Sequence, residues 1–152
     1  MISIKIVVRD DLDHLFALQV HPEQRDYVAA NPISIAEFAY VSGGYVFSIW
    51  SDDEIVGLMG IIDFQEHKEL EDGDDPGAAF LMRMMVADRH QGRGIGKAAM
   101  LLAFDWARTR GNTCFQTGVV PGNEDATRFY EAMGLQKTGR IVEGEIEMSR
   151  RL

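Results

Sequence analysis

The sequence has little of what marks disulfide-stapled, repetitive or membrane-spanning proteins. Its 152 residues contain one cysteine, Cys114, so no intrachain disulfide can form, and we expect a reducing, cytoplasmic location. Only four prolines occur, with no low-complexity tract and no repeat of fixed period, which argues against linkers and solenoids. No apolar run approaches the roughly 18 residues of a membrane span, and no signal-peptide pattern is present. We expect a single domain over residues 1–152 that does not contact a membrane.

Positive charge is also scarce. Lysine and arginine total 15 against 24 aspartates and glutamates, which gives a net charge of -9. Such a chain should repel nucleic acid and attract cations. The acidic segment from Gln65 to Pro76 is interpreted as a solvated turn, with a cation-attracting lip as the alternative. The histidines show no metal-ligand spacing and are expected at the surface, so no metal site is predicted.

Hydrophobic periodicity predicts a mixed α/β sheet with helices packed on it. Asp10, Ser34 and Asn123 are predicted N-caps, and Gly134 is predicted to end the last helix. The helix over residues 94–110 is apolar on most sides, so we expect it to be buried. Strands are expected at residues 2–8, 45–51, 54–64, 78–86, 113–120, 135–141 and 145–150, and helices at residues 10–19, 21–31, 34–41, 94–110 and 123–133.

Three alternating glycines stand between the strand over residues 78–86 and the long helix that follows. The N–H groups at the start of a helix are unpaired and carry the positive end of its dipole, so this geometry favours an anion. A phosphate-binding P-loop would need a hydroxyl residue in place of Ala98 and one more glycine upstream. A dinucleotide fingerprint would need different glycine spacing and a position near the start of the chain.

The segment Gln91-Gly92-Arg93-Gly94-Ile95-Gly96 resembles the acetyl-CoA pyrophosphate loop of the GNAT superfamily of N-acetyltransferases. The resemblance extends through Val119–Leu135, which is similar to the next block of that family. It implies the single-domain GNAT fold, a twisted, mixed but mostly antiparallel sheet of about six or seven strands with helices on both faces. It also implies acetyl-CoA as co-substrate. The cofactor-binding residues that it implies are Met85, Val86, Gln91, Gly92, Arg93, Gly94, Ile95, Gly96, Lys97 and Asn123.

The glycine segment is basic within an acidic chain. This local excess should favour the polyanionic coenzyme A, because physiological salt screens charges over about 8 Å. The basic residues of this segment are Arg89, Arg93, Lys97, Arg108 and Arg110, against Asp88 and Asp105.

Acetyl transfer from a thioester needs a stabilised carbonyl oxygen and a protonated leaving thiolate. The resemblance implies direct attack by the amine, with a backbone N–H near Met85 or Val86 at the carbonyl oxygen. The same strand end should pair with the pantetheine amides. The resemblance makes Tyr130 the general acid, and a phenol pKa of about 10 lies near that of an alkyl thiol. The alternatives are that Tyr130 belongs to the core and that Asn123 is only an N-cap.

A general base is harder to find. Some polyamine acetyltransferases carry a carboxylate on the strand before the loop, but Leu81–Met85 contains none. An aliphatic amine of pKa about 10 costs roughly 4 kcal/mol to deprotonate at pH 7. A water chain could lead to a more distant acid, with Asp63, Glu23 and Asp26 as the candidates.

The acceptor is predicted to be a small-molecule amine, most specifically spermidine or spermine. Residues Gln19–Phe38 resemble the bacterial spermine/spermidine acetyltransferase branch, through Gln24, Tyr27, Asn31, Ser34 and Glu37. Glu23, Asp26 and Tyr27 are the predicted substrate-binding residues, because carboxylates and an aromatic face attract a cation. The alternatives are a protein N-terminus or lysine as acceptor, and a non-catalytic acyl-CoA-binding module. A homodimer is a further expectation.

Overall fold

The computed structural model describes residues 1–152 and consists of one mixed sheet flanked by helices. The seven strands lie in the order β1-β2-β3-β4-β5-β7-β6, and only β4 and β5 run parallel. This confirms the predicted fold class. The strands are β1 (Ile2–Ile6), β2 (Gly44–Ser51), β3 (Glu54–Asp63), β4 (Ala78–Val86), β5 (Cys114–Val119), β6 (Gln136–Val142) and β7 (Glu145–Arg151). The helices are α1 (Leu12–Ala17), α2 (Asn31–Phe38), α3 (Ile95–Thr109) and α4 (Glu124–Ala132).

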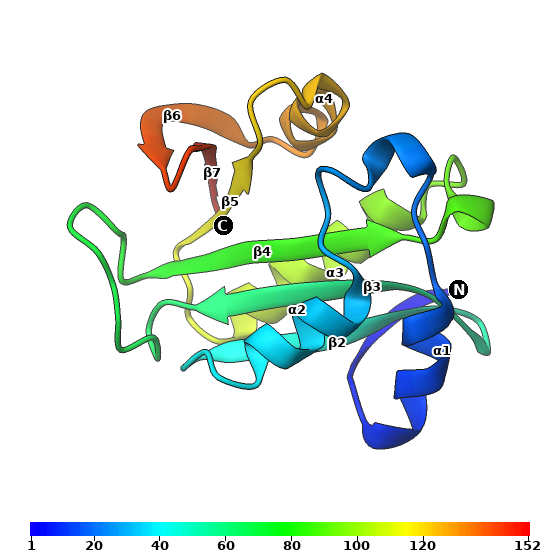
Figure 1. The fold of residues 1–152 in the computed structure, drawn as a ribbon. Coiled ribbons are helices and arrows are strands. Elements are labelled where there is room, and N and C mark those ends of the chain that lie inside the picture. Colours follow the sequence, from blue (N-terminus) through cyan, green and yellow to red (C-terminus); the bar gives the residue numbers. More distant parts are fainter.

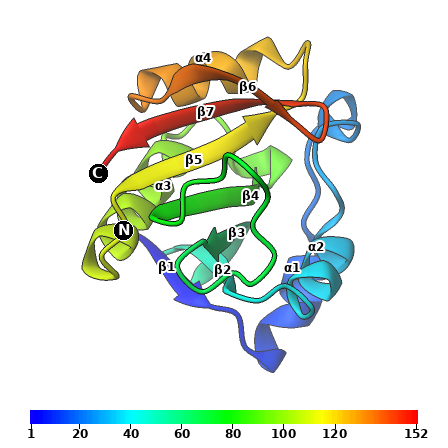
Figure 2. The same ribbon diagram turned by 90° about the vertical axis from the view of Figure 1, so that its left-hand side faces the viewer.

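The helices cover both faces of the sheet. Figure 2 shows α1 and α2 on one side of the strands and α3 on the other, with α4 at the top beside β6. The largest core lies under α3, where Phe104 meets Phe115 of β5 edge to face, with ring centroids 4.9 Å apart. The predicted burial of this helix holds for one face of α3, whereas the other face exposes Leu101 and the charged residues. No helix combines the length and apolarity needed to cross a membrane.

The N-terminal helices differ most from the predictions. Residues Pro22–Gln24 form only a 3-10 turn, where a helix over 21–31 was expected. Helix α2 begins at Asn31 with Pro32 in its first turn, a position where proline costs nothing because the N–H is unpaired there anyway. Ser34 is therefore inside the helix and buried, and is not its cap.

The caps and turns elsewhere follow the sequence more closely. At the first helix the Asp11 carboxylate, and not Asp10, accepts the Val8 N–H at 3.0 Å. Asn123 caps α4 as predicted, since its Oδ1 accepts the Ala126 N–H at 3.3 Å. The predicted hairpin of β2 and β3 is present around Asp52.

Strands β4 and β5 separate after a short parallel contact, which positions the site. Their pairing covers only Ala78 to Leu81 on β4 and Cys114 to Thr117 on β5. The pairing of β3 with β4 skips Met82, a β-bulge that bends β4 at this point. Beyond it β5 turns away from β4 (Figure 1), and the second half of β4 has no strand on that side. An open wedge therefore lies between the carboxyl ends of the two strands.

Candidate active site

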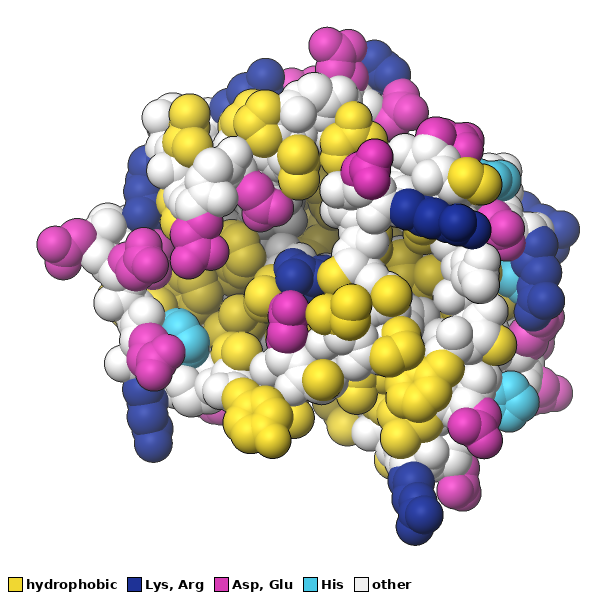
Figure 3. All heavy atoms as spheres, in the orientation of Figure 1, with side chains coloured by type: hydrophobic (Ala, Val, Ile, Leu, Met, Phe, Trp, Pro, Cys, Tyr) yellow, Lys and Arg dark blue, Asp and Glu magenta, His cyan; other side chains and the backbone are white.

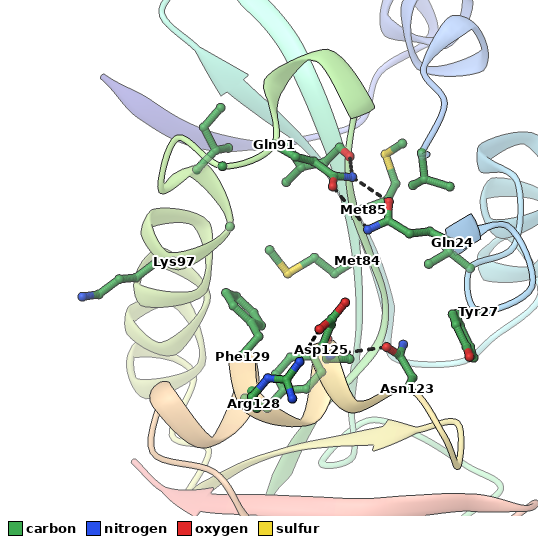
Figure 4. A pocket seen from close by; sticks show the side chains of 18 of the residues that line it. Gln24, Tyr27, Met84, Met85, Gln91, Lys97, Asn123, Asp125, Arg128 and Phe129 are labelled. Atoms are coloured by element: carbon green, nitrogen blue, oxygen red, sulfur yellow. Dashed lines mark hydrogen bonds and ion pairs between the residues drawn. The ribbon is translucent and has the colours of Figure 1, made fainter. Parts of the chain in front are cut away.

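A cleft of about 950 Å³ opens at the wedge between β4 and β5. Figure 4 shows side chains from four parts of the chain converging on it. It is lined by the end of β4 (Met84–Val86), the glycine loop and first turn of α3 (Gln91–Lys97, Arg93 excepted), the start of α4 (Gly122–Tyr130, Thr127 excepted) and parts of the segment before α2 (Val20, Glu23, Gln24, Tyr27 and Val28). The cleft thus brings together every predicted cofactor residue except Arg93, together with Tyr130, Glu23 and Tyr27. Asp26 does not line it.

The glycine loop presents a row of free backbone donors. None of the N–H groups from Gly92 to Lys97 donates a hydrogen bond within the protein. Gly92 and Gly94 have φ angles of 77° and 78°, which other residues rarely adopt, and a Cβ at either would project into open space. Together with the positive end of the 15-residue helix α3, these donors fit a pyrophosphate.

Gly96 serves packing. A Cβ there would lie 3.5 Å from the Phe129 ring and 3.6 Å from Met84 Cε. The absent side chain lets the first turn of α3 approach both residues, which line the same cleft.

Only part of the predicted basic patch is available to an anion. Arg89 pairs with Glu54, Arg108 with Asp105, and Arg110 with Asp63 and Glu66. Arg93 and Lys97 are exposed and make no ion pair, so the free positive charge lies on the loop itself. The Lys97 side chain extends away from the centre of the cleft (Figure 4).

The side-chain amides of Gln91 and Gln24 form two hydrogen bonds with each other. Gln91 Nε2 donates to Gln24 Oε1 at 2.9 Å, and Gln24 Nε2 donates back to Gln91 Oε1 at 3.3 Å. Gln91 Nε2 also lies 2.9 Å from the Val86 carbonyl oxygen, and the His21 N–H orients Gln24 from behind at 3.2 Å. This contact joins the glycine loop to the segment before α2 (Figure 4).

Strand geometry selects between the two predicted oxyanion donors. The Ala87 N–H bonds to the Val56 carbonyl, so the backbone of Ala87, and by alternation that of Met85, points toward β3. The backbone groups of Met84 and Val86 therefore point into the wedge. Val86 is the residue whose N–H faces the cleft, while Met85 packs its side chain below, against Leu15 and Leu58.

Tyr130 stands where the cleft passes through the sheet. It lines the large cleft and also a groove of about 120 Å³ on the other side of the wedge. Burial raises the pKa of its phenol to about 12, the nearby carboxylate of Glu145 acts in the same direction, and the Thr117 hydroxyl opposes both. The phenol is thus a weaker acid than an ordinary tyrosine, whose pKa of about 10 lies near that of an alkyl thiol.

Of the three proposed distant bases, Glu23 lines the cleft, whereas Asp26 and Asp63 do not. Asp63 ends β3 opposite Ala79, six residues before Met85, which is about 20 Å along the strand. Its carboxylate accepts from Arg110 Nε and Asn112 Nδ2, both at 2.9 Å. Burial alone would raise its pKa, but these hydrogen bonds lower it overall, as expected for a structural carboxylate.

Glu37 was expected beside the acceptor acids, but it is occupied. Its carboxylate pairs with Arg83 at 3.1 Å. Arg83 lines the groove behind Tyr130, and its Nε is buried without a partner. Glu145, at the start of β7, lines the same groove, and sequence reasoning gave it no role.

Other reactive side chains carry no site. No group of histidine, cysteine and carboxylate residues is arranged to hold a metal. His90 is buried and not at the surface as expected, with its Nε2 3.3 Å from Glu54 Oε1. Burial raises the pKa of the Cys114 thiol to about 11, and Asp75 beside it adds to the shift, so Cys114 is no nucleophile.

Comparison with known proteins gives consistent matches. Residues 8–135 match the model of the acetyltransferase (GNAT) family. The rat N-acetyltransferase family 8 member 2 is 31% identical over 140 residues, which cover 84% of this chain and 55% of that protein. The mouse probable N-acetyltransferase family 8 member 5 is 37% identical over 65 residues, or 41% of this chain and 28% of that protein. The chain thus spans about a quarter to a half of the length of these relatives.

Solved structures share the fold at low identity. Aminoglycoside acetyltransferase AAC(6')-Ib in complex with coenzyme A superposes with a TM-score of 0.81 at 18% identity, over 99% of this chain and 95% of that one. The GNAT domain of S. lividans PAT gives 0.76 at 20% identity, over 98% and 89% of the two chains.

Proposed function

Because the chain belongs to the acetyltransferase (GNAT) family, we propose that it transfers the acetyl group of acetyl-CoA to the primary amine of a small molecule by direct attack. The observation that carries this proposal is the row of free N–H groups from Gly92 to Lys97, which leads into the wedge where Tyr130 stands. A non-catalytic acyl-CoA-binding module would have no need for a phenol at the passage between the two sides of the sheet.

The donor side follows from the free backbone groups. The N–H groups of Gly92 to Lys97 would hold the pyrophosphate, with the charges of Arg93 and Lys97 nearby. The free backbone groups of Met84 would bond the pantetheine amides as an added strand would, since the Val86 carbonyl oxygen already accepts from Gln91. The thioester supplies the activated acetyl group.

Two residues would act on the reacting atoms, and a third would hold one of them in place. The Val86 N–H would stabilise the oxygen that gains charge. Tyr130 would donate its proton to the leaving sulfur, since a phenol of raised pKa stays protonated at neutral pH. Asn123 holds the N-terminus of α4, so its contribution would be to keep that helix, and with it Tyr130, in place.

The acceptor side favours a cationic amine. Glu23 and the exposed ring of Tyr27 line the cleft. Figure 3 shows apolar side chains across the middle of the face that carries α2, with acidic and basic side chains interspersed around its edge. Spermidine and spermine fit such a surface and remain our specific prediction. The relatives are named as N-acetyltransferases and aminoglycoside acetyltransferases, which supports an amine acceptor without selecting a polyamine. The cytoplasmic location and the homodimer also remain predictions.

The experiment is a thiol-release assay with acetyl-CoA over a panel of amines. The panel is spermidine, spermine, kanamycin, and a short peptide with a free N-terminus and one lysine. We expect turnover of at least one small-molecule amine, with the polyamines ahead of the others. Acetylation of the peptide alone would contradict a small-molecule acceptor and indicate a protein N-terminus or lysine as the acceptor. Coenzyme A binding without any turnover would support the non-catalytic module.

A further inference from the structure

The proposed reaction lacks a carboxylate for the acceptor's ammonium. The second half of β4 carries none, Asp63 lies at the other end of the sheet, and Glu37 is paired with Arg83. Glu23 lines the cleft but is exposed, and the other two carboxylates of the cleft, those of Glu124 and Asp125, pair with Arg128. The acceptor groove behind Tyr130 contains one further carboxylate, that of Glu145.

Glu145 is held over a glycine at the mouth of the wedge. Its Oε2 lies 2.9 Å from the position that a Cβ on Gly118 would occupy, and its own Cβ lies 3.2 Å from it. Gly118 does not have a positive φ, so a side chain is excluded there by space and not by backbone conformation. Gly118 directly follows Thr117, the last residue of β5 that pairs with β4. The glycine therefore leaves room for a carboxylate where the strands separate.

Glu145 has no partner of its own. Its carboxylate takes part in no hydrogen bond or ion pair within the protein, although the residue is half-buried. Glu147, two residues along the same strand, faces the same way and is fully satisfied, by Arg140 Nη1 at 2.9 Å and by Thr138 Oγ1 at 2.9 Å. Two carboxylates on one strand face thus have opposite roles. The Glu147 carboxylate is paired within the protein, whereas the Glu145 carboxylate is free to pair with a ligand.

The groove places Glu145 and Tyr130 on the two sides of one space. Both residues line it, together with Met84 of β4 and Tyr27 of the segment before α2. Tyr130 also faces the donor cleft, which Glu145 does not line. An amine entering from the α2 side would meet Glu145 before it reached the carbon next to Tyr130.

We infer that Glu145 binds the ammonium of the acceptor and accepts the proton that the amine must lose before it attacks. This inference rests on the proposed function. The proton passes from R–NH3⁺ to the carboxylate and then to water. The nitrogen lone pair forms the C–N bond to the thioester carbon, and the C–S bond breaks. Tyr130 gives its proton to sulfur and regains one from the acetylated nitrogen. The products are the amide, the free thiol and one proton released to solvent.

The test compares Glu145→Gln with Glu143→Gln. Both remove one negative charge, but Glu143 is exposed in the turn between β6 and β7 and lines neither the cleft nor the groove. With the panel amine that the wild type acetylates fastest, Glu145→Gln should lower kcat/KM by about 100-fold or more at pH 7, as for a lost general base. Glu143→Gln should stay within about twofold of the wild type. Acetyl-CoA affinity, measured by calorimetry, should be unchanged in both.

The pH profile separates a proton acceptor from a merely structural residue. The deficit of Glu145→Gln should shrink as pH rises toward 10, because solvent then deprotonates the amine without help. The other titratable or charged groups facing Glu145 are Tyr130 from α4, Arg83 from β4 and Tyr27 from the segment before α2. None of them is altered by the substitution. A deficit that stayed constant with pH would overturn the inference.

A second variant moves the carboxylate without removing it. In Gly118→Ala the new Cβ would displace the flexible end of the Glu145 side chain, while the Glu145 Cβ, 3.2 Å away, would have to give by a few tenths of an ångström. We expect a loss of kcat/KM similar to that of Glu145→Gln. If both variants match Glu143→Gln while the wild type is active, the inference about Glu145 fails and the proposed function stands. If the wild type acetylates no amine of the panel, both fail.

Discussion

Replacing Tyr130 by Phe tests the chemistry of the site and removes one oxygen atom. A general acid matched to its task contributes about 10²–10⁴ in rate. The pKa of Tyr130, about 12, lies about two units above the matched value of about 10. With a Brønsted coefficient of about 0.5 this mismatch removes roughly a factor of ten. Tyr130→Phe should therefore lower kcat by about 10- to 1000-fold, with little change in acetyl-CoA affinity.

The assay is thiol release in parallel with calorimetry of coenzyme A binding. Tyr40→Phe is the control, because it loses the same atom from an exposed ring outside the cleft. A second expectation concerns pH. Since the Tyr130 phenol stays protonated to about pH 12, its ionisation should produce no loss of kcat below about pH 11. Wild-type turnover in a folded Tyr130→Phe protein would refute the reasoning and assign the ring to the core alone.

Three further substitutions probe the loop, the acceptor wall and the scaffold. Gly94→Val should weaken coenzyme A binding at least tenfold. Gly139→Val is the control and should not, because Gly139 has a similar positive φ and equally open space but lies outside the cleft. Equal affinities of the two variants in calorimetry would disprove the assignment of the loop to coenzyme A. Glu23→Gln should raise the spermidine KM and flatten its rise with ionic strength, whereas Asp26→Asn should change neither. Asp63→Asn should cost about 3 kcal/mol of unfolding free energy at pH 7. Because the folded pKa of Asp63 is depressed, that difference should begin to shrink in urea titrations as pH falls below about 4 and vanish only below the folded pKa, and a constant difference would exclude the ion pair as its cause.

Local signals in the sequence predicted the parts of the fold that local physics decides. Asn123 and Gly134 fixed the ends of α4, and strong apolar runs gave β3 and β4 nearly to the residue. The segment from His21 to Ser34 was misjudged. The segment contains two prolines. Pro22 was expected to start a helix, but the proline in the first turn of a helix is Pro32. Both are compatible with a first turn, and tertiary contacts decide between them, including the buried bond from Asn31 Nδ2 to the Leu15 carbonyl.

The charges of the loop show a different limit of sequence reasoning. Five basic residues predicted a patch, but three of them are paired, and two of these, Arg89 and Arg110, have partners far along the chain. Glu54 lies 35 residues before Arg89, and Asp63 lies 47 residues before Arg110. Ion pairs of this separation depend on strand order and register. No sequence pattern within the loop distinguishes a paired arginine from a free one.

Strand order also explains why the acceptor carboxylate escaped detection. Strand β7 inserts between β5 and β6, so that Glu147 lies opposite Gly118 and Ser149 opposite Gln116. This register sets Glu145 just past Val119, beyond the end of the β4–β5 pairing at Thr117, on the face that also carries α2. In the sequence, "GVV" and "EGEIE" are 25 residues apart, and each is an unremarkable strand fragment. A one-residue slip of β7 would turn Glu145 to the α3 side of the sheet, so the position of this carboxylate depends on the packing of Met148 in the main core. The same buried side chain that stabilises the last strand thereby determines which side of Tyr130 carries the negative charge.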